Sequence, residues 1–505
     1  MIANAATFTN NGTVLNFDAG TGEAGGIALG SFTPTTGATT LINNGRITLQ
    51  GANVNNANVR SAVSMFGING QLSDYRIING ASGVIEDLTG GNIAIESSSS
   101  TFTAHRVTLT NAGVIRGDIR TQGGADRLSF TGGSVTGSVS TFGGNDRLDW
   151  SGGTFVGDVD LGLGSDVMTI SSSSYTGANV LDGGDDLSTA DGAIDSLTLS
   201  GVNATLAATD ILNWENVEIS ASNISVSNGT MAVGTVGQAT TGLTLSNNTR
   251  FRPTGNFALA GNLLTTTGGR FVGHGSGANP YSISGALTND GEIDVSDGNV
   301  GDTVSVAGNY NGSGALRLDT ELGDDGSPTD QLVIAGDASG NTALFVRNAG
   351  GAVAVTDRGV KVVDVAGTST SDAFRLGAPA EGGAFIYNLE FEGSDQDWYL
   401  RSTGEIGTVG VAYESALHVL GTRLPTLEQR VGQRIWGQGK EDSELDGAWL
   451  RVTGAYSEIT PENSTSQTTI DRRIWALMRR LPKTLVRCRL RMAAVKSMQL
   501  PLVLV

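Results

Sequence analysis

An internal repeat of 20 residues is the feature that most restricts what this chain can fold into. Between residues 101 and 200 a Gly-x-Asp motif recurs at this spacing, and a second column of glycines keeps the same period. A unit this short cannot bury its inner face alone, so successive units must stack on one another. The acidic members are Asp126, Asp146, Asp166 and Asp186; the glycines are Gly124, Gly144, Gly164 and Gly184, and Gly117, Gly137, Gly157 and Gly177.

Strands are expected between these glycines. In RLSF, RLDW and VMTI an apolar residue recurs at every second position, as a half-buried strand requires. Elsewhere, Asn-Gly turns lead into β-branched residues, as in NNGTV, NNGRI, NAGVI and NDGEI. The composition, with 73 Gly, 6% aromatic and 16% charged residues, predicts an all-β fold. We expect a right-handed parallel β-helix, or solenoid, over residues 1–300.

Composition changes after residue 300. Residues 301–402 carry longer apolar strands such as ALRLDT and VKVVDVAG, which are expected to form a β cap over the open end of the solenoid. Residues 403–446 repeat apolar positions at intervals of three and four, which predicts a short helical linker interrupted by Pro425.

These segments, in this order, resemble a bacterial autotransporter passenger of the pertactin-like kind. The cap resembles the autochaperone region from AGNYNGSGALRLDTELGDDGSPTDQLVIAG through GVKVVDV to GAFIYNLEF and DWYLRS. TLEQRVGQR resembles the helix before the family's barrel, and GAWLRVTGAY the first barrel strand, so residues 447–478 are expected to begin an outer-membrane barrel. The resemblance implies export to the outer membrane or cell surface, and a passenger that folds from its C-terminal cap.

Both ends depart from that pattern. The start lacks a basic, then apolar, export signal, and too few residues follow Trp449 for a closed barrel. All 50 acidic residues lie at or before Asp471, whereas residues 479–505 are basic and lack glycine. The sequence therefore suggests a truncated or out-of-frame product with an incomplete barrel and an aberrant tail. A basic membrane-surface segment is the alternative.

The Asp column partly resembles a calcium nonapeptide repeat. Stacked carboxylates about 5 Å apart repel unless a divalent ion, or Arg127 and Arg147, relieves them. Calcium at Asp126, Asp146, Asp166 and Asp186 is therefore an expectation, with solvated turn caps as the alternative. No other cofactor is expected.

Other motifs indicate little chemistry. Arg116-Gly117-Asp118 spells an integrin-binding tripeptide, but Gly117 already belongs to a glycine column. His105, His274 and His418 show no metal-like spacing, and Cys488, the single cysteine, cannot form an intramolecular disulfide.

Two functions remain open at this point. The first is a non-enzymatic, monomeric scaffold for adhesion or aggregation, whose partners are host-cell or matrix surfaces or neighbouring cells. The second is a secreted carbohydrate-active enzyme with a site at Asp182, Asp185 and Asp186. A net charge of −19 disfavours nucleic acid as a partner.

Overall fold

The computed structural model describes residues 2–3, 5–18, 26–31, 37–51, 61–67, 73–98 and 105–404 except His274, Ser276 and Ala384. It also describes Gly407, residues 410–412, β45 (Leu450–Ile459) and β46 (Ile470–Arg479). The chain divides into a unit that ends at Gly404 and a second unit that starts at Glu405.

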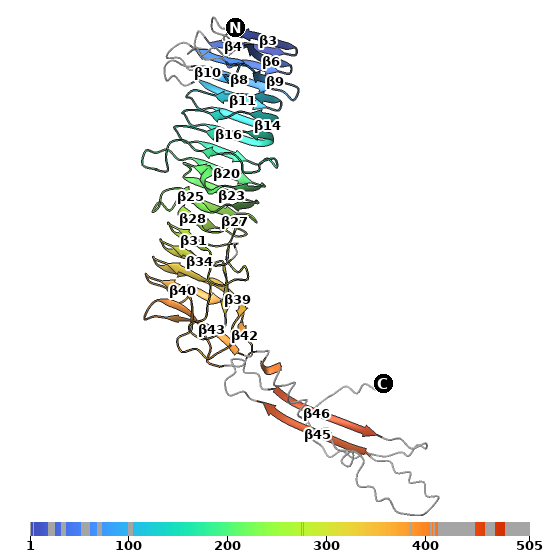
Figure 1. The fold of residues 1–505 in the computed structure, drawn as a ribbon, viewed down its shortest axis with the longest axis vertical. Coiled ribbons are helices and arrows are strands. Elements are labelled where there is room, and N and C mark those ends of the chain that lie inside the picture. Colours follow the sequence, from blue (N-terminus) through green and yellow to red (C-terminus); the bar gives the residue numbers. More distant parts are fainter. Residues whose placement is uncertain are drawn as a thin grey trace, which may run out of the picture. The chain divides into compact units, whose positions relative to one another are not determined.

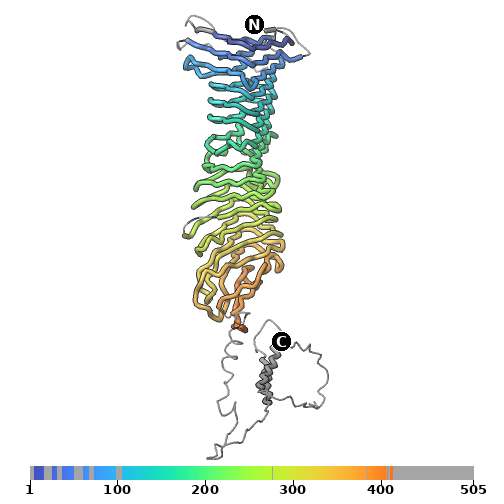
Figure 2. The backbone as a smooth tube through the Cα atoms, turned by 90° about the vertical axis from the view of Figure 1, so that its right-hand side faces the viewer, coloured from blue at the N-terminus to red at the C-terminus, as the bar shows by residue number. Residues whose placement is uncertain are grey.

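The first unit is a stack of short parallel strands, in which each turn of the chain pairs with the turns before and after it (Figures 1 and 2). The predicted parallel β-helix is confirmed. One sheet starts at the N-terminus and contains β1 (Ile2–Ala3), β4 (Ile27–Ser31), β7 (Val63–Gly67), β10 (Ile93–Ser98), β13 (Asp118–Arg120), β15 (Val139–Ser140), β17 (Val159–Asp160), β19 (Leu181–Asp182) and β22 (Ile211–Leu212).

The second sheet runs along most of the stack. It contains β2 (Thr7–Asn10), β3 (Thr13–Asp18), β5 (Thr39–Asn43), β6 (Arg46–Gly51), β8 (Asp74–Asn79), β9 (Val84–Asp87), β11 (Arg106–Asn111), β12 (Val114–Arg116), β14 (Arg127–Thr136), β16 (Arg147–Val156), β18 (Val167–Ile170), β20 (Ser196–Ser200), β23 (Asn216–Ser220), β26 (Gly242–Ser246), β29 (Leu263–Thr265), β32 (Leu287–Asn289), β35 (Tyr310–Gly312) and β38 (Ala338–Gly340).

Two further sheets form in the C-terminal part of the stack. One begins just before the 3₁₀ turn η1 (Ala208–Asp210), and the other begins after it. The third contains β21 (Asn203–Leu206), β24 (Asn223–Val226), β27 (Arg250–Pro253), β30 (Arg270–Val272), β33 (Glu292–Asp294), β36 (Ala315–Glu321), β39 (Thr342–Gly350) and β41 (Phe374–Leu376). The fourth contains β25 (Gly229–Val233), β28 (Phe257–Gly261), β31 (Pro280–Ile283), β34 (Thr303–Val306), β37 (Gln331–Ile334), β40 (Val360–Val365), β44 (Asp397–Arg401), β43 (Phe385–Glu392) and β42 (Ala380–Gly382).

The predicted glycine columns are required by the backbone. Gly144 has φ +124°, a conformation that costs a residue with a Cβ free energy. A Cβ built on Gly144 would also lie 2.0 Å from the carbonyl oxygen of Gly124 on the preceding turn. Glycine at this position therefore permits both the turn and the close stacking of one turn on the next.

An inward-facing asparagine ladder joins the first turns of the solenoid. Asn10 donates to Asn43, Asn43 to Asn79 and Asn79 to Asn111, each over 2.8 Å between Nδ2 and Oδ1. All four side chains are buried. Their spacings of 33, 36 and 32 residues exceed the 20 residues of the central repeat. The Asn-Gly turns seen in the sequence thus belong to longer turns of the same stack.

Aromatic side chains fill the core of the central turns. Trp150 packs edge-on against Phe155 and Tyr175, with ring centroids 5.4 and 5.5 Å apart, and Phe130 lies 5.7 Å from Phe155. These residues are almost completely buried. Such ring contacts favour one alignment of successive turns over shifted ones.

Parallel pairing continues across residue 300, where the sequence predicts the boundary of the cap. β34 pairs in parallel with β31 before it and with β37 after it. The direction changes later, where β44 pairs antiparallel with β40 and with β43, and β43 with β42. The stack of parallel strands therefore ends at an antiparallel hairpin formed by β43 and β44. Figure 1 shows β43 at the lower end of the stack.

In the second unit β45 and β46 pair antiparallel from Leu450–Arg479 to Ile459–Ile470. The strand expected in residues 447–478 is thus present as part of this pair. Almost all of the predicted helical linker and of the basic tail lie outside the described residues. No described helix is long and apolar enough to cross a membrane.

Candidate functional site

Buried carboxyl groups line one corner of the central solenoid, where a turn enters the second sheet. Each accepts the backbone N–H of the residue that occupies the same place one turn earlier. Val107 N–H donates to Asp126 over 2.7 Å, Asp126 N–H to Asp146 over 2.7 Å, and Asp146 N–H to Asp166 over 2.6 Å. The pattern continues from Asp166 to Asp195 and on to Glu215. The carboxyl ladder, as we name it, consists of Asp126, Asp146, Asp166, Asp195 and Glu215.

The second oxygen of every ladder carboxyl is buried and has no hydrogen-bond partner. The ladder side chains are at most 2% exposed. In the described part of the chain, no three Asp, Glu, His or Cys side chains are grouped so that they could hold a metal ion. In this geometry each carboxyl caps a backbone N–H of the preceding turn. Calcium binding stays a prediction from the sequence.

Burial raises the pKa of the ladder carboxyls. The pKa of Asp126 and Asp166 rises to about 8, and that of Asp146 to about 6. Asp195 reaches about 8, where burial is followed by the charges of Asp185 and Glu215 as causes. Hydrogen bonds from the backbone lower each value in part, but they do not offset the loss of solvent.

The structure corrects the fourth member of the predicted Asp column. Asp186 is exposed and caps its own turn by accepting the N–H of Ser188. Asp195 takes its place, 29 residues after Asp166, because this turn of the chain is longer than its neighbours. The alternation in DSLTL after Asp195, and in ENVEI after Glu215, matches the earlier repeats better than DDLST does.

The arginines expected to relieve the column do not reach it. Arg147 makes two hydrogen bonds to Asp149, over 2.8 and 2.7 Å, on the outer face of the same strand. Arg127 is exposed. Among the described ion pairs none joins a Lys or Arg to the ladder.

The three acidic residues considered for hydrolysis serve the turn that carries them. Asp182 accepts the side-chain amide of Asn213 over 2.8 Å and the N–H of Gly184 over 3.0 Å. Asp185 faces the buried Asp195, whereas Asp186 points to solvent. The contacts of Asp182 and Asp185 are therefore contacts within the fold.

The Arg116-Gly117-Asp118 tripeptide is held within the stack. Arg116 pairs with the buried Glu86 over 2.9 Å, and Asp118 pairs with Arg120 over 2.9 Å. Asp118 also accepts the N–H of Ser138 on the next turn. Both charged side chains thus stabilise neighbouring turns.

Of the histidines, His105 is buried and packs edge-on against Tyr75 at 5.7 Å between ring centroids. Burial lowers its pKa. His274 and His418 lie outside the described residues. His105 is therefore part of the core, and sequence spacing alone could not have revealed its partner.

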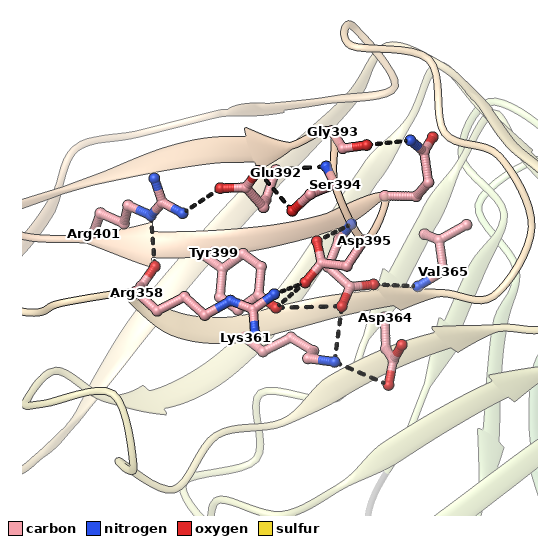
Figure 3. Close-up of polar contacts among 12 residues, drawn as sticks. Arg358, Lys361, Asp364, Val365, Glu392, Gly393, Ser394, Asp395, Tyr399 and Arg401 are labelled. Atoms are coloured by element: carbon pink, nitrogen blue, oxygen red, sulfur yellow. Dashed lines mark hydrogen bonds and ion pairs between the residues drawn. The ribbon is translucent and has the colours of Figure 1, made fainter.

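A polar cluster fixes the antiparallel hairpin at the end of the stack (Figure 3). The buried Asp397 accepts the N–H of Val365 and pairs with Lys361, both over 2.8 Å. Arg358 lies over the Tyr399 ring, 5.0 Å from its centroid. Arg358 also pairs with Asp395, whose carboxylate accepts the Tyr399 hydroxyl over 2.7 Å.

Arg401 adds a second set of contacts in this hairpin. It pairs with Glu390 over 2.9 Å and with Glu392 over 3.0 Å, both on the facing strand β43. Figure 3 shows the contact with Glu392. The Arg401 side chain holds the pKa of Glu392 below its usual value. The sequence did not single out this cluster, although β43 carries acidic residues at alternate positions, Glu390 and Glu392, and β44 ends in Arg401.

Two shallow hollows lie on the outer surface of the described solenoid. One, of about 300 Å³, includes Asp118, Arg120, Asp158 and Asp160 beside Phe142, whose side chain is 49% exposed. The other, of about 390 Å³, crosses the fourth sheet. Its floor consists of small outward side chains on successive turns. They include Thr230, Ala258, Ser282, Ser305 and Val333.

Comparison with known families identifies the C-terminal part of the stack. The family described as Autochaperone Domain Type 1 matches residues 282–389. This range covers the last parallel turns and the first strands of the antiparallel end. It also crosses residue 300, as the parallel pairing does.

Three curated relatives are named as autotransporters or probable autotransporters. The chain is 34% identical over 227 residues to the adhesin BmaC autotransporter of Brucella suis, which covers 37% of this chain and 7% of that protein. It is 37% identical over 126 residues to the probable autotransporter YfaL of Escherichia coli, covering 24% of this chain and 10% of that one. The autotransporter adhesin AIDA-I of Escherichia coli is 27% identical over 182 residues, covering 34% and 14%. The matched segments are thus a small fraction of these relatives.

Proposed function

This chain is an autotransporter passenger with a type 1 autochaperone domain, and from that premise we propose that it is a non-enzymatic adhesion scaffold at the bacterial surface. Two relatives are named adhesins. In an autotransporter the passenger is exported across the outer membrane. The proposed adhesive faces of the solenoid would therefore lie outside the cell. Host-cell or matrix surfaces and neighbouring cells are the proposed partners.

The observation that carries this proposal is the shape of the outer surface. Successive turns present flat strands, and the hollow on the fourth sheet has small side chains over five turns. Such a face suits broad, shallow contact with a partner, in which many weak contacts add up along the stack. Hydrolysis of a polysaccharide instead requires paired carboxylates in a cleft. Asp182, Asp185 and Asp186 are engaged in their own turn, which favours the scaffold over the enzyme.

The antiparallel hairpin supports a second part of the proposal, that residues 301–402 cap the solenoid and nucleate its folding. A parallel stack ends in unpaired backbone groups, which would bind further strands. β44 and β43 cover the edge of β40 with antiparallel pairing, and the Asp397 and Arg401 contacts fix them in place. The autochaperone match covers most of this region.

A direct test immobilises the purified chain and measures attachment of epithelial cells and of bacteria, together with release of sugars from a panel of polysaccharides. We expect attachment that saturates with the amount of protein and no release of sugars. Ser282→Arg places a bulky charge on the small-residue face and should weaken attachment severalfold. Thr154→Arg is the matched control, because Thr154 is exposed on a different sheet. Measurable chain cleavage would establish the enzyme instead, and attachment equal for all variants would exclude the fourth sheet.

A further inference from the structure

The carboxyl ladder carries an inference beyond adhesion. Its five side chains occupy the same place on consecutive turns of the solenoid. Adjacent turns in a parallel sheet are about 4.8 Å apart. If every ladder carboxyl were ionised, each charge would therefore face a like charge within about 5 Å, in a region from which water is excluded.

The surroundings of the ladder offer no compensating cation in the described structure. Asp126 faces the hydroxyl of Thr121 and the carboxyl of Asp146. Asp166 faces further carboxyls at both ends, Asp146 and Asp195, and is also influenced by Asp185. Glu215 is close to Asp195, and the charges of Asp185 and Asp186 act on it. Every titratable neighbour that acts on the ladder is thus acidic.

Each ladder carboxyl also has one oxygen that the fold leaves free. The first oxygen accepts one backbone N–H, and the second is buried without a partner. In Asp195 the free oxygen packs against the backbone of Gly183, where a Cβ would lie 3.0 Å away. A proton bound to the free oxygen removes the charge and leaves the acceptor of the backbone N–H in place.

We propose that the carboxyl ladder is a proton-binding site, in which the free oxygens carry protons in mildly acidic solution and lose them as the pH rises through neutral, and that this loss opens the turns between residues 106 and 246. The ladder then makes the centre of the solenoid most stable in acid. The proposal concerns the ladder and is independent of what the outer surface binds.

The direction of the pH dependence follows from burial. The pKa of an unfolded Asp is about 3.9, whereas burial raises that of Asp146 to about 6 and those of Asp126, Asp166 and Asp195 to about 8. The folded state therefore binds more protons than the unfolded state between these values. The contribution to stability is complete below about pH 4 and is lost as the pH rises through 6 to 8.

Hydrogen exchange of the full-length chain, followed by mass spectrometry from pH 5 to pH 9, tests the proposal. After correction for intrinsic exchange, opening of residues 106–246 should increase with pH. The limit is about tenfold per pH unit for each carboxyl that loses its proton on opening. Residues 250–272 contain no Asp, Glu or His and serve as the internal reference. Equal pH profiles for the two segments would overturn the proposal.

A pair of variants localises the effect. Asp146→Asn keeps an oxygen for the Asp126 N–H and replaces the protonated oxygen by an amide, so the segment should lose part of its pH dependence and be better protected at pH 8 than the wild type. Asp191→Asn is the matched control and should follow the wild-type profile, because Asp191 is exposed and accepts the N–H of Ala193 in its own turn. Poorer protection of Asp146→Asn at pH 8 would mean that the fold favours the ionised carboxylate over a neutral side chain, and would contradict the proposal.

Two measurements on the wild-type chain make the test independent of how the variants fold. Infrared spectroscopy should detect the carbonyl band of buried carboxylic acids at pH 6, and this band should disappear by pH 9. Its absence at pH 6 would overturn the proposal. A rise in melting temperature with millimolar calcium at pH 7.5, reversed by a chelator and absent in Asp146→Asn, would also overturn it and would assign the ladder to the metal.

Discussion

Asp146 in the carboxyl ladder and Asp397 in the terminal hairpin are both almost completely buried, yet they meet different partners. Asp397 pairs with Lys361 and accepts the N–H of Val365. Asp146 accepts one N–H, and its other oxygen is unpartnered. The comparison teaches that a buried carboxyl can be neutralised by a cation in the antiparallel hairpin and, as we propose for the ladder, by a proton in the parallel stack. It also shows that the central turns and the hairpin should respond to different perturbations.

The largest effect is expected from Trp398→Ala in the hairpin. Trp398 is 3% exposed, donates its indole N–H to Ser369 over 3.0 Å, and packs against Phe374 and Phe391. Its removal should cost about 3–5 kcal/mol of local stability and slow refolding of the chain. Hydrogen exchange of residues 360–402 and recovery from urea would measure both.

Val355→Ala is the control for Trp398→Ala, because Val355 is 59% exposed. If Trp398→Ala weakens the hairpin while the central turns stay protected, the two regions open independently, as expected for a repeat protein. Equal loss of protection in both regions would mean that the stack unfolds as one unit. Unchanged refolding would contradict the proposed nucleating role of the cap.

A smaller but still clear effect is expected from Gly144→Ala in the central turns. The turn holds this residue at φ +124°, which is strained for alanine. The added Cβ would also lie 2.0 Å from the carbonyl oxygen of Gly124. The strained backbone alone costs about 1–3 kcal/mol, and the contact adds to it. Gly350→Ala has a similar φ of +121° but no atom within 4 Å of the Cβ, so it isolates the backbone cost. Equal melting temperatures for the two variants would exclude the stacking contact.

The smallest effect is expected from Arg358→Gln on the hairpin surface. Arg358 and Asp395 are 55% and 27% exposed, and ion pairs of this kind contribute about 0–1 kcal/mol.

Acid should weaken the hairpin rather than stabilise it, because Arg401 lowers the pKa of Glu392. The stability that the Glu392 carboxylate contributes is therefore lost as the pH falls below about 4.5. Hydrogen exchange at pH 4 and pH 6 measures this. A hairpin that gains protection in acid, as the ladder region is expected to, would remove the contrast between the two regions.

Much of the fold could be predicted because each 20-residue unit needs glycine at the same turn and apolar residues at the same strand positions. Gly124, Gly144 and Gly164 mark the same turn, and the alternation in RLSF and RLDW marks the same strand. The site was harder to predict. Asp126, Asp146 and Asp166 were found from spacing, but spacing failed at Asp186, where a longer turn shifts the column to Asp195.

The direction in which the carboxyls point could not be predicted either. An Asp beside a turn is usually solvated, and nothing in a linear pattern states that its side chain will be covered. Arg127 and Arg147 were one of two ways in which the column's repulsion could be relieved. Arg147 does not reach the column, because a strand alternates its faces and Arg147 points outward to Asp149.

Three properties could be read from the sequence alone: the stacking of short strands, the positions where turns need glycine, and the resemblance of the C-terminal part to an autochaperone region. They could be read because they depend on local backbone conformation and on repeated patterns. The tertiary structure decided which residues share a column, which carboxyls are buried, and which of them meet a cation. Those properties depend on how many residues each turn contains and on what the neighbouring turn places beside a side chain. Residues such as Asp166 and Asp195, 29 positions apart, become neighbours when the turns are stacked.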